Sequence, residues 1–275
     1  MTLKKKYNQL AESNTALIAA NIYNFETING IVQAAKNEKV PVILQASIRT
    51  IDYLGVQVTA KLAKTVLEQH DVEGWVHLDH TDSIELIQQC LDAGFDSVMI
   101  DASDKPMDEN IEITKKVVDL AAQYNVSVEA ELGHVADPGD DVSDSTFYTK
   151  PHEAKIFVES TGIDALAVAI GSAHGFYESE PRLNISLLKQ IHQSTSCALV
   201  LHGGSGIPAS QIQQSVINGV KKFNLATEFK SAFMKSLKKE IKTSSDLDIR
   251  KVFQNPTKKI TEIVSQKMRI IKSVH

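Results

Sequence analysis

The sequence predicts an α/β fold of the TIM (β/α)8 barrel type, in which eight parallel strands alternate with helices. Three observations support this prediction: eight apolar runs of strand length, helical patterns between them, and a length of 275 residues, which suits one barrel domain. The runs are nearly continuous in Val, Ile, Leu and Ala, as in strands buried on both faces. An open doubly wound sheet is the alternative, but it usually has a glycine-rich loop after its first strand, and residues 21–26 contain no glycine.

The eight expected strands leave room for a helix after each of them. They are Ala16–Ile22, Pro41–Ser47, Trp75–His80, Ser97–Ser103, Ser127–Gly133, Ala165–Ser172, Ala198–Gly204 and Val220–Thr227. Right-handed crossover connections would keep these strands parallel and in sequence order. No low-complexity linker divides the chain, so we expect residues 1–275 to form a single domain.

Helical spacing marks the segments between the strands. Ser83–Ala93 gathers apolar residues mostly on one face, with Asp82 or Ser83 as the N-cap and Gly94 as the stop. Three further connecting helices are expected at Ile111–Ala122, Pro151–Ser160 and Pro208–Ile217. Beyond the last strand, Glu228–Lys242 and Ile249–Val274 also predict helices, and we expect residues 243–275 to be a C-terminal helical extension. This extension either packs on its own barrel or helps to build a subunit interface.

Composition and charge exclude several classes of protein. The chain has 29 basic and 34 acidic residues, a formal net charge of −5, and 43% hydrophobic residues, which is typical of a soluble globular protein. Nucleic-acid binding would favour a basic excess. The basic run Lys4–Lys6 precedes no apolar segment, so we interpret it as a solvated start rather than a signal peptide. Cys90 and Cys197 are far apart and fit a reducing compartment. We therefore expect a cytoplasmic protein that binds neither nucleic acid nor a membrane.

Three histidines stand at the expected carboxyl ends of strands, where barrel enzymes have their active sites. His80, His174 and His202 end the third, sixth and seventh strands. One histidine in such a place is more often structural than a ligand, but three on one rim favour a metal site. Zn²⁺ suits three imidazoles and keeps a coordination position open. Iron, cobalt and manganese stay open as alternatives.

Three carboxylates follow the same pattern. Asp79 precedes the first of the histidines, and it either orients an imidazole or serves as a general acid and base. Asp101 and Glu131 end the fourth and fifth strands, and they either bind a second cation or hold histidines by hydrogen bonds.

The loops after the seventh and eighth strands predict a phosphate site. Residues 203–206 read Gly-Gly-Ser-Gly and residues 224–227 read Asn-Leu-Ala-Thr. Glycines let backbone N–H groups approach an anion, Ser205 and Thr227 add hydroxyl groups, and phosphate sites recur in these two loops of barrel enzymes.

Taken together, these motifs resemble the class II, metal-dependent ketose-bisphosphate aldolases of the fructose and tagatose types. The matching stretches are Asn21–Thr27, His77–His80, Gly94–Ser103, Val128–Gly133, Asp164–Gly175, Leu199–Pro208 and Phe223–Glu228. The resemblance covers nearly the whole chain in order. The length and the Asn-Leu-Ala-Thr-Glu motif are closer to the tagatose-type branch.

The resemblance implies a function. The enzyme would reversibly cleave a phosphorylated ketose, similar to fructose or tagatose bisphosphate, to dihydroxyacetone phosphate and an aldehyde through a zinc-stabilised enediolate. Family members also use a monovalent cation, Na⁺ or K⁺, near the phosphate, and they assemble as dimers or tetramers.

The resemblance also implies roles for individual residues. His80, His174 and His202 would bind zinc, and Asp79 would transfer the proton. Asp101 and Glu131 match carboxylates near the metal. The positions that match the family's binding site for the dihydroxyacetone phosphate part are Gly175, Gly203, Ser205, Asn224 and Thr227.

Two stretches depart from the family pattern. The loop after the fifth strand usually carries Gly-Gly-x-Glu-Asp, but residues 136–141 read Ala-Asp-Pro-Gly-Asp-Asp, so Gly139 replaces the glutamate and Asp140 or Asp137 is the candidate acid or base. The lysine that usually follows His-Gly is missing, and Glu178 and Glu180 stand in that region. Either the substrate differs from the usual bisphosphates or the activity is reduced.

Two other functions stay open at this point. A metal-dependent hydrolase or isomerase acting on a sugar phosphate would use the same rim, with metal-bound water as the nucleophile. A catalytically weakened aldolase homologue would have a role in binding or assembly.

Overall fold

A computed structural model describes residues 1–11, 13–135, 145–177 and 179–274. Eight parallel strands form a closed barrel in sequence order, and the last strand pairs with the first. The strands are β1 (Leu17–Asn21), β2 (Val42–Ser47), β3 (Gly74–Asp79), β4 (Ser97–Ile100), β5 (Ser127–Leu132), β6 (Ala165–Val168), β7 (Ala198–Leu201) and β8 (Val220–Leu225). The expected TIM barrel is confirmed.

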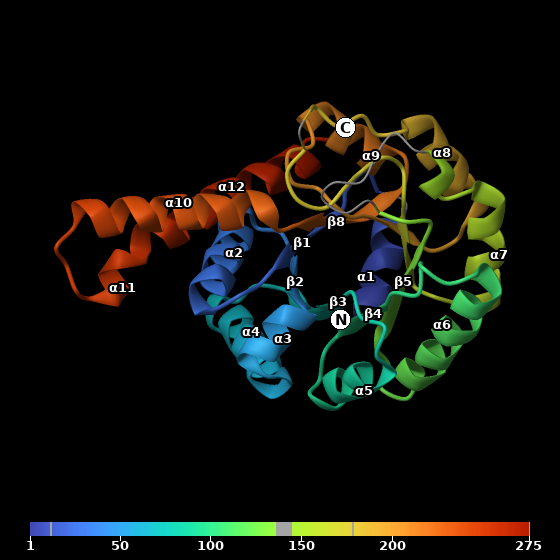
Figure 1. Ribbon diagram of the computed structural model, residues 1–275, viewed down its shortest axis with the longest axis horizontal. Coiled ribbons are helices and arrows are strands. Elements are labelled where there is room, and N and C mark those ends of the chain that lie inside the picture. The colour runs from blue at the N-terminus through green and yellow to red at the C-terminus, as the bar shows by residue number, and fades with distance from the viewer. Residues whose placement is uncertain (12, 136–144, 178, 275) are drawn as a thin grey trace.

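Helices surround the barrel and follow the strands around it (Figure 1). They are α1 (Leu3–Leu10), α2 (Phe25–Glu38), α3 (Ile48–Leu54), α4 (Val56–His70), α5 (Ile84–Asp92), α6 (Met107–Ala122), α7 (Pro151–Thr161), α8 (Ile185–Ser194), α9 (Ala209–Ile217), α10 (Thr227–Thr243), α11 (Ile249–Val252) and α12 (Gln254–Lys272), with a short 3₁₀ helix, η1 (Ser145–Phe147). The Ser83 side chain caps α5 by accepting from the N–H of Leu86. Within the described ranges, no helix is both long and apolar enough to cross a bilayer.

Several strands end earlier than the sequence predicts. β6 stops at Val168, although the apolar run continues, because Ala169 exchanges hydrogen bonds with Thr149 of the preceding loop rather than with a strand. His174 therefore lies in the loop after β6 and not at the strand end. Asp101 and His202 likewise come one residue after β4 and β7.

Helix α1 closes the amino-terminal end of the barrel. Its Leu3 and Tyr7 are buried in an apolar cluster that includes Trp75 of β3. Lys4 and Lys5 are exposed, as expected for a solvated start, and ion pairs add to this: the Lys4 ammonium lies 2.8 Å from Asp164, and that of the partly buried Lys6 lies 2.7 Å from Glu73. These ion pairs hold α1 against the barrel.

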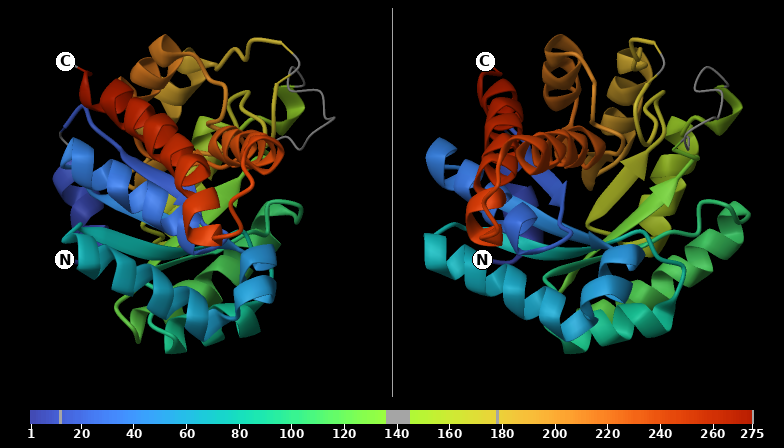
Figure 2. Two further views of the ribbon diagram at one scale, coloured as in Figure 1. Left: turned by 90° about the vertical axis from the view of Figure 1, so that its left-hand side faces the viewer. Right: turned by 60° about the vertical axis from the view of Figure 1, so that its left-hand side comes forward.

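The expected C-terminal helices are present. α10 and α12 lie side by side and project from the barrel, with α11 at their far end (Figure 1). α12 also packs along α2, as the two views of Figure 2 show. Gly30 of α2 permits this contact, since a Cβ atom there would lie 2.9 Å from Ile260 Cβ and 3.0 Å from the carbonyl oxygen of Thr257.

Replacing this glycine tests the packing of α12. Gly30→Ala would improve helix propensity by about 1 kcal/mol, but the added methyl group must push α12 away. We expect a net loss of about 1–3 kcal/mol in the free energy of unfolding, measured by urea titration. Lys36→Ala on the exposed side of α2 is the control, and its expected change is within about 0.5 kcal/mol. A Gly30→Ala protein as stable as the wild type would contradict this packing.

Candidate active site

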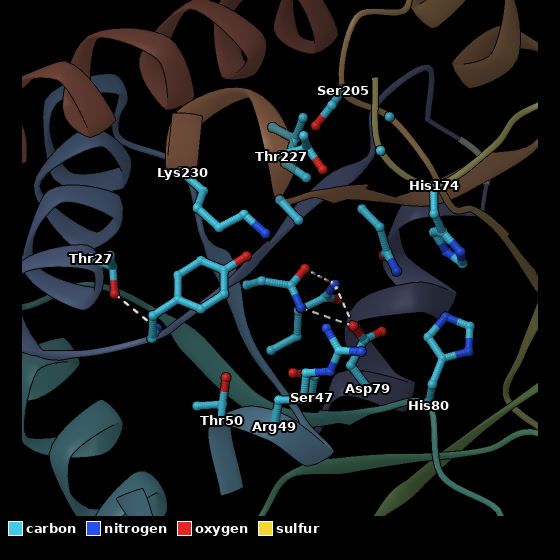
Figure 3. Close-up of a pocket in the computed structure, with 18 of the residues that line it drawn as sticks. Thr27, Ser47, Arg49, Thr50, Asp79, His80, His174, Ser205, Thr227 and Lys230 are labelled. Carbon is cyan, nitrogen blue, oxygen red and sulfur yellow. Dashed lines mark hydrogen bonds between the residues drawn. The ribbon is translucent and has the colours of Figure 1, made fainter. Parts of the chain in front are cut away.

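A pocket of about 850 Å³ opens at the carboxyl end of the barrel (Figure 3). Its size is within the usual range for small-molecule sites. Eight of the site residues expected from the sequence line it: Asp79, His80, His174, Gly175, Gly203, Ser205, Asn224 and Thr227. The other described ones, His202, Asp101 and Glu131, lie next to this lining.

The three histidines converge. Each offers a ring nitrogen within 4.8 Å of the others. His80 Nε2 lies 2.8 Å from His202 Nδ1, and the ring centroids of His80 and His174 are 5.2 Å apart. His80 has a left-handed backbone with φ of +44°, a conformation that is uncommon for residues other than glycine and often found at functional sites. A convergent imidazole set of this kind fits Zn²⁺.

Asp101 and Glu131 form a second group with His80. The Asp101 Oδ2 atom lies 2.7 Å from His80 Nδ1, and Ser103 donates to Oδ1 from both its N–H and its hydroxyl group. Glu131 is buried and accepts from the N–H of Val135 at 3.0 Å. His80, Asp101 and Glu131 together offer ligand atoms within 4.8 Å of one another, so this group also has the composition of a metal site.

Charges at the rim shift several pKa values in the metal-free protein. Burial acts to lower the pKa of His80, but the hydrogen bond to Asp101 and the charge of Asp79 raise it to about 10. Burial raises the pKa of Glu131 to about 8. For Asp101, the bond to His80 outweighs burial and holds its pKa well below the ordinary value. His80 is thus a cation between carboxylates until a metal displaces its proton.

Asp79 is held by two amides that sequence reasoning did not single out as site residues. Its Oδ2 atom accepts from Asn21 Nδ2 at 3.0 Å and from Gln45 Nε2 at 3.3 Å. Burial acts to raise the pKa of Asp79, but the nearby His80 and Lys222 charges outweigh it, so the pKa stays below its ordinary value. The carboxylate is therefore ionised.

Some buried acceptors of the pocket have no hydrogen-bond partner among the described residues. They are Asp79 Oδ1, Gln45 Oε1 and Asn224 Oδ1. Buried polar atoms are normally satisfied. Acceptors left open in a pocket indicate a ligand that carries hydroxyl groups.

Charged side chains also lie inside the barrel, behind the histidines. The Lys222 ammonium is fully buried and lies 2.8 Å from the carboxylate of Glu129, which also accepts from His202 Nε2 at 3.0 Å. Sequence reasoning missed both residues. Strand alternation could have found them, because Glu129 shares a face with Glu131, and Lys222 shares one with Asn224. Lys222 does not line the pocket.

The loops after β6 and β7 approach each other closely. Gly203 has φ of +69°, and a Cβ atom there would lie 2.2 Å from the carbonyl oxygen of Ala173. The Tyr177 hydroxyl group joins the two loops, accepting from the N–H of Ala173 at 2.9 Å and donating to the Gly203 carbonyl at 2.8 Å. Ser205 Oγ accepts from the N–H of Glu228 in the first turn of α10. The loops and this helix N-terminus together have the features of an anion site.

A model of the family described as class-II fructose-bisphosphate aldolase matches residues 1–275. The chain belongs to this family. It is accordingly an aldolase and a lyase, and the resemblance stated from the sequence is confirmed. Class II aldolases are generally zinc-dependent.

Individual relatives agree with this assignment. A fructose-bisphosphate aldolase of Staphylococcus epidermidis is 40% identical over 276 residues, which cover 98% of this chain and 96% of the relative. The crystal structure of the YdjI aldolase from Escherichia coli K12 has a TM-score of 0.88 and 32% identity, with 99% of this chain and 97% of that chain covered. A fructose-bisphosphate aldolase of Campylobacter jejuni has a TM-score of 0.86 at 22% identity, covering 99% and 94% of the two chains, and shares the fold.

Two departures from the class II aldolase pattern lie partly outside the described residues. Asp137, Gly139 and Asp140 of the loop after β5 are outside them, as is Glu178. Glu180 is exposed and does not line the pocket.

Two cations that sequence reasoning missed, Arg49 after β2 and Lys230 in α10, do line the pocket. Each follows an expected strand end, Ser47 or Thr227, within three residues, so extending the search into the first turn of the next helix could have found them.

The Tyr177 bridge can be tested in this aldolase without substrate. Tyr177→Phe removes one donor and one acceptor from the half-buried link between the two loops, and we expect the free energy of unfolding to fall by about 1–3 kcal/mol. Denaturant titration measures this loss. Tyr53→Phe is the matched control, because Tyr53 is 76% exposed and its change should be near zero. Equal effects of the two substitutions would refute the bridge.

Proposed function

We propose that this class II aldolase reversibly cleaves a phosphorylated ketose, similar to fructose or tagatose bisphosphate, into dihydroxyacetone phosphate and an aldehyde. One observation carries the proposal. His80, His174 and the open oxygen of ionised Asp79 line the same pocket as the loops after β6 and β7, and His202 converges with the other two imidazoles directly behind this lining. The Staphylococcus relative that carries the name fructose-bisphosphate aldolase supports it.

In this proposal, His80, His174 and His202 hold one Zn²⁺ ion. Bound there, zinc would act as a Lewis acid on the ketone oxygen and stabilise the negative charge that develops as the carbon–carbon bond breaks. Asp101 orients His80 through its 2.7 Å contact, and with Glu131 it either completes a second metal position or remains a support for the first.

Asp79 is the proposed acid and base. Its open Oδ1 atom would take the proton from the hydroxyl group on the carbon that becomes the aldehyde, and would return it in the condensation direction. Asn21 and Gln45 hold the other oxygen of Asp79, so the carboxylate has one fixed orientation. Asp140 of the loop after β5 is our proposed acid and base at the carbon of dihydroxyacetone phosphate.

The phosphate of the dihydroxyacetone part would bind at Gly175, Gly203, Ser205, Asn224 and Thr227. These residues line one pocket, and Thr227 is the first residue of α10, where backbone N–H groups and the helix dipole favour an anion. A monovalent cation, Na⁺ or K⁺, is proposed beside this phosphate.

We further propose one domain comprising residues 1–275, a cytoplasmic location, and a homodimer or homotetramer that binds neither nucleic acid nor a membrane.

Metal removal and Asp79→Asn test this function. We expect the zinc-loaded wild type to release dihydroxyacetone phosphate from fructose or tagatose 1,6-bisphosphate, and chelator treatment to abolish the release until zinc is restored. Asp79→Asn should lower kcat about 10²- to 10⁴-fold while zinc content stays at the wild-type level. The assay couples dihydroxyacetone phosphate to NADH oxidation, with Asp52→Asn at an exposed position of α3 as the control. If zinc-loaded wild type released none from either sugar, the function would be wrong.

We propose in addition that the substrate carries a second acidic group, which Arg49 and Lys230 bind. Figure 3 shows Lys230 on the opposite side of the pocket from His80. The Lys230 ammonium lies 5.5 Å from the centroid of the Tyr23 ring. Among the described residues, no acid forms an ion pair with Arg49 or Lys230. Among the described lining residues, Asp79 is the one acid, and it is already held by amides. Two cations in a ligand pocket, with no acidic partner among the described residues, favour an anionic ligand group.

Arg49→Met tests whether Arg49 binds the second acidic group of the substrate rather than its dihydroxyacetone phosphate part. We expect KM for the ketose bisphosphate to rise about 10- to 100-fold because a charge-assisted contact is lost, while kcat/KM for the 1-monophosphate of the same ketose changes little. Steady-state kinetics on both substrates measure the difference. Arg250→Met, at the far end of the projecting helices, is the control. Equal losses for both substrates would show that Arg49 does not bind the second acidic group.

A further inference from the structure

Below the histidines, the barrel interior contains a charged cluster to which neither the family match nor the proposed reaction assigns a task. We propose that Glu129 and Lys222 form a buried positioning pair that fixes the tautomer and orientation of His202, and thereby the affinity of the three histidines for zinc. The inference rests on the proposed zinc site and deepens it. Neither residue lines the pocket, so both act through His202 rather than on the substrate.

The hydrogen bonds of His202 determine its tautomer. A carboxylate accepts only, so the 3.0 Å contact between His202 Nε2 and Glu129 Oε1 requires the proton on Nε2. His202 Nδ1 then presents its lone pair to the cluster, where it accepts from His80 Nε2 at 2.8 Å. His80 in turn donates from Nδ1 to Asp101. The chain of bonds leaves His202 Nδ1 as the atom prepared for a metal.

Lys222 keeps Glu129 in this role. Its ammonium lies 2.8 Å and 3.0 Å from the two oxygens of the Glu129 carboxylate, and both side chains are at most 1% exposed. Without Lys222 the carboxylate would be an unpaired charge in the barrel interior, which proteins rarely tolerate. Removing the lysine would therefore let Glu129 rearrange or admit water, and His202 would lose its fixed acceptor.

His77 completes the support. Its Nδ1 lies 2.9 Å from the Ser97 hydroxyl group, and its Nε2 lies 3.3 Å from the Lys222 ammonium. Burial and the charge of Lys222 hold the pKa of His77 well below its ordinary value, so the neutral ring accepts from Lys222. The lysine is thus fixed between His77 and Glu129, and it cannot turn toward solvent because the side chain is fully buried.

The tests use the full-length protein with Glu129→Gln, Lys222→Met and the double variant. The amide that Glu129→Gln introduces is able to donate as well as accept, so the His202 tautomer is no longer fixed. We expect each variant to weaken zinc binding about 10- to 100-fold, as is typical when a residue that orients a metal ligand is lost. Competition with a chelator of known affinity measures this change. Nitrogen-15 NMR of His202 in the zinc-free protein should change from the Nε2–H form to a mixture of tautomers.

Two controls separate positioning from a general effect on folding. The double variant leaves no unpaired charge from this pair in the interior, so its melting temperature should recover toward the wild type while its zinc affinity stays weakened. Lys267→Met removes another buried lysine, which lies 3.0 Å from Glu228 and outside the histidine cluster, and it should leave zinc affinity unchanged.

A folded double variant with wild-type zinc affinity and an intact Nε2–H tautomer would overturn the inference. The NMR measurement of the tautomer needs neither zinc nor turnover. A wild type that shows the Nε2–H form but cleaves no ketose would therefore refute the proposed function alone. A wild type with mixed tautomers would refute the positioning pair alone.

Discussion

The ion pair between Lys222 and Glu129, 2.8 Å long and buried at the centre of the barrel, is the interaction on which the site depends. A single charge in such an interior would be costly, so each residue requires the other. Their strands, β8 and β5, are not neighbours in the closed barrel. Any change in barrel closure would separate the two charges, and the pair therefore couples the geometry of the whole barrel to His202 above it.

Every second side chain of a strand points into the barrel, and successive inward positions give its interior three levels. At the amino-terminal end, α1 and apolar residues such as Trp75 and Met99 exclude water. The charged pair and His77 occupy the middle. The histidines and Asp79 stand at the open end, where the pocket begins. The apolar layer keeps the middle dry, and a dry middle makes the hydrogen bonds behind the histidines strong and directional.

The sequence was sufficient for the barrel and for much of the rim, because long apolar runs mark parallel strands and rim residues follow those runs directly. It extended the sixth strand to Ser172, and so placed His174 at a strand end, because apolar residues continue into the buried loop after β6, which hydrogen-bonds to Thr149 instead. The contact between Glu129 and Lys222 was not predicted because the two residues are 93 positions apart in the sequence, and only closure of the barrel brings them together. The same applies to the meeting of Arg49 and Lys230 in one pocket.

A crystal structure of the zinc-loaded protein, with anomalous diffraction recorded on both sides of the zinc absorption edge, tests the central claim most directly. We expect one strong anomalous peak about 2.0–2.1 Å from a nitrogen of each of His80, His174 and His202. The atom contributed by His202 should be Nδ1, with Nε2 still bonded to Glu129. A peak bound elsewhere, or bound by Nε2 of His202, would contradict the account.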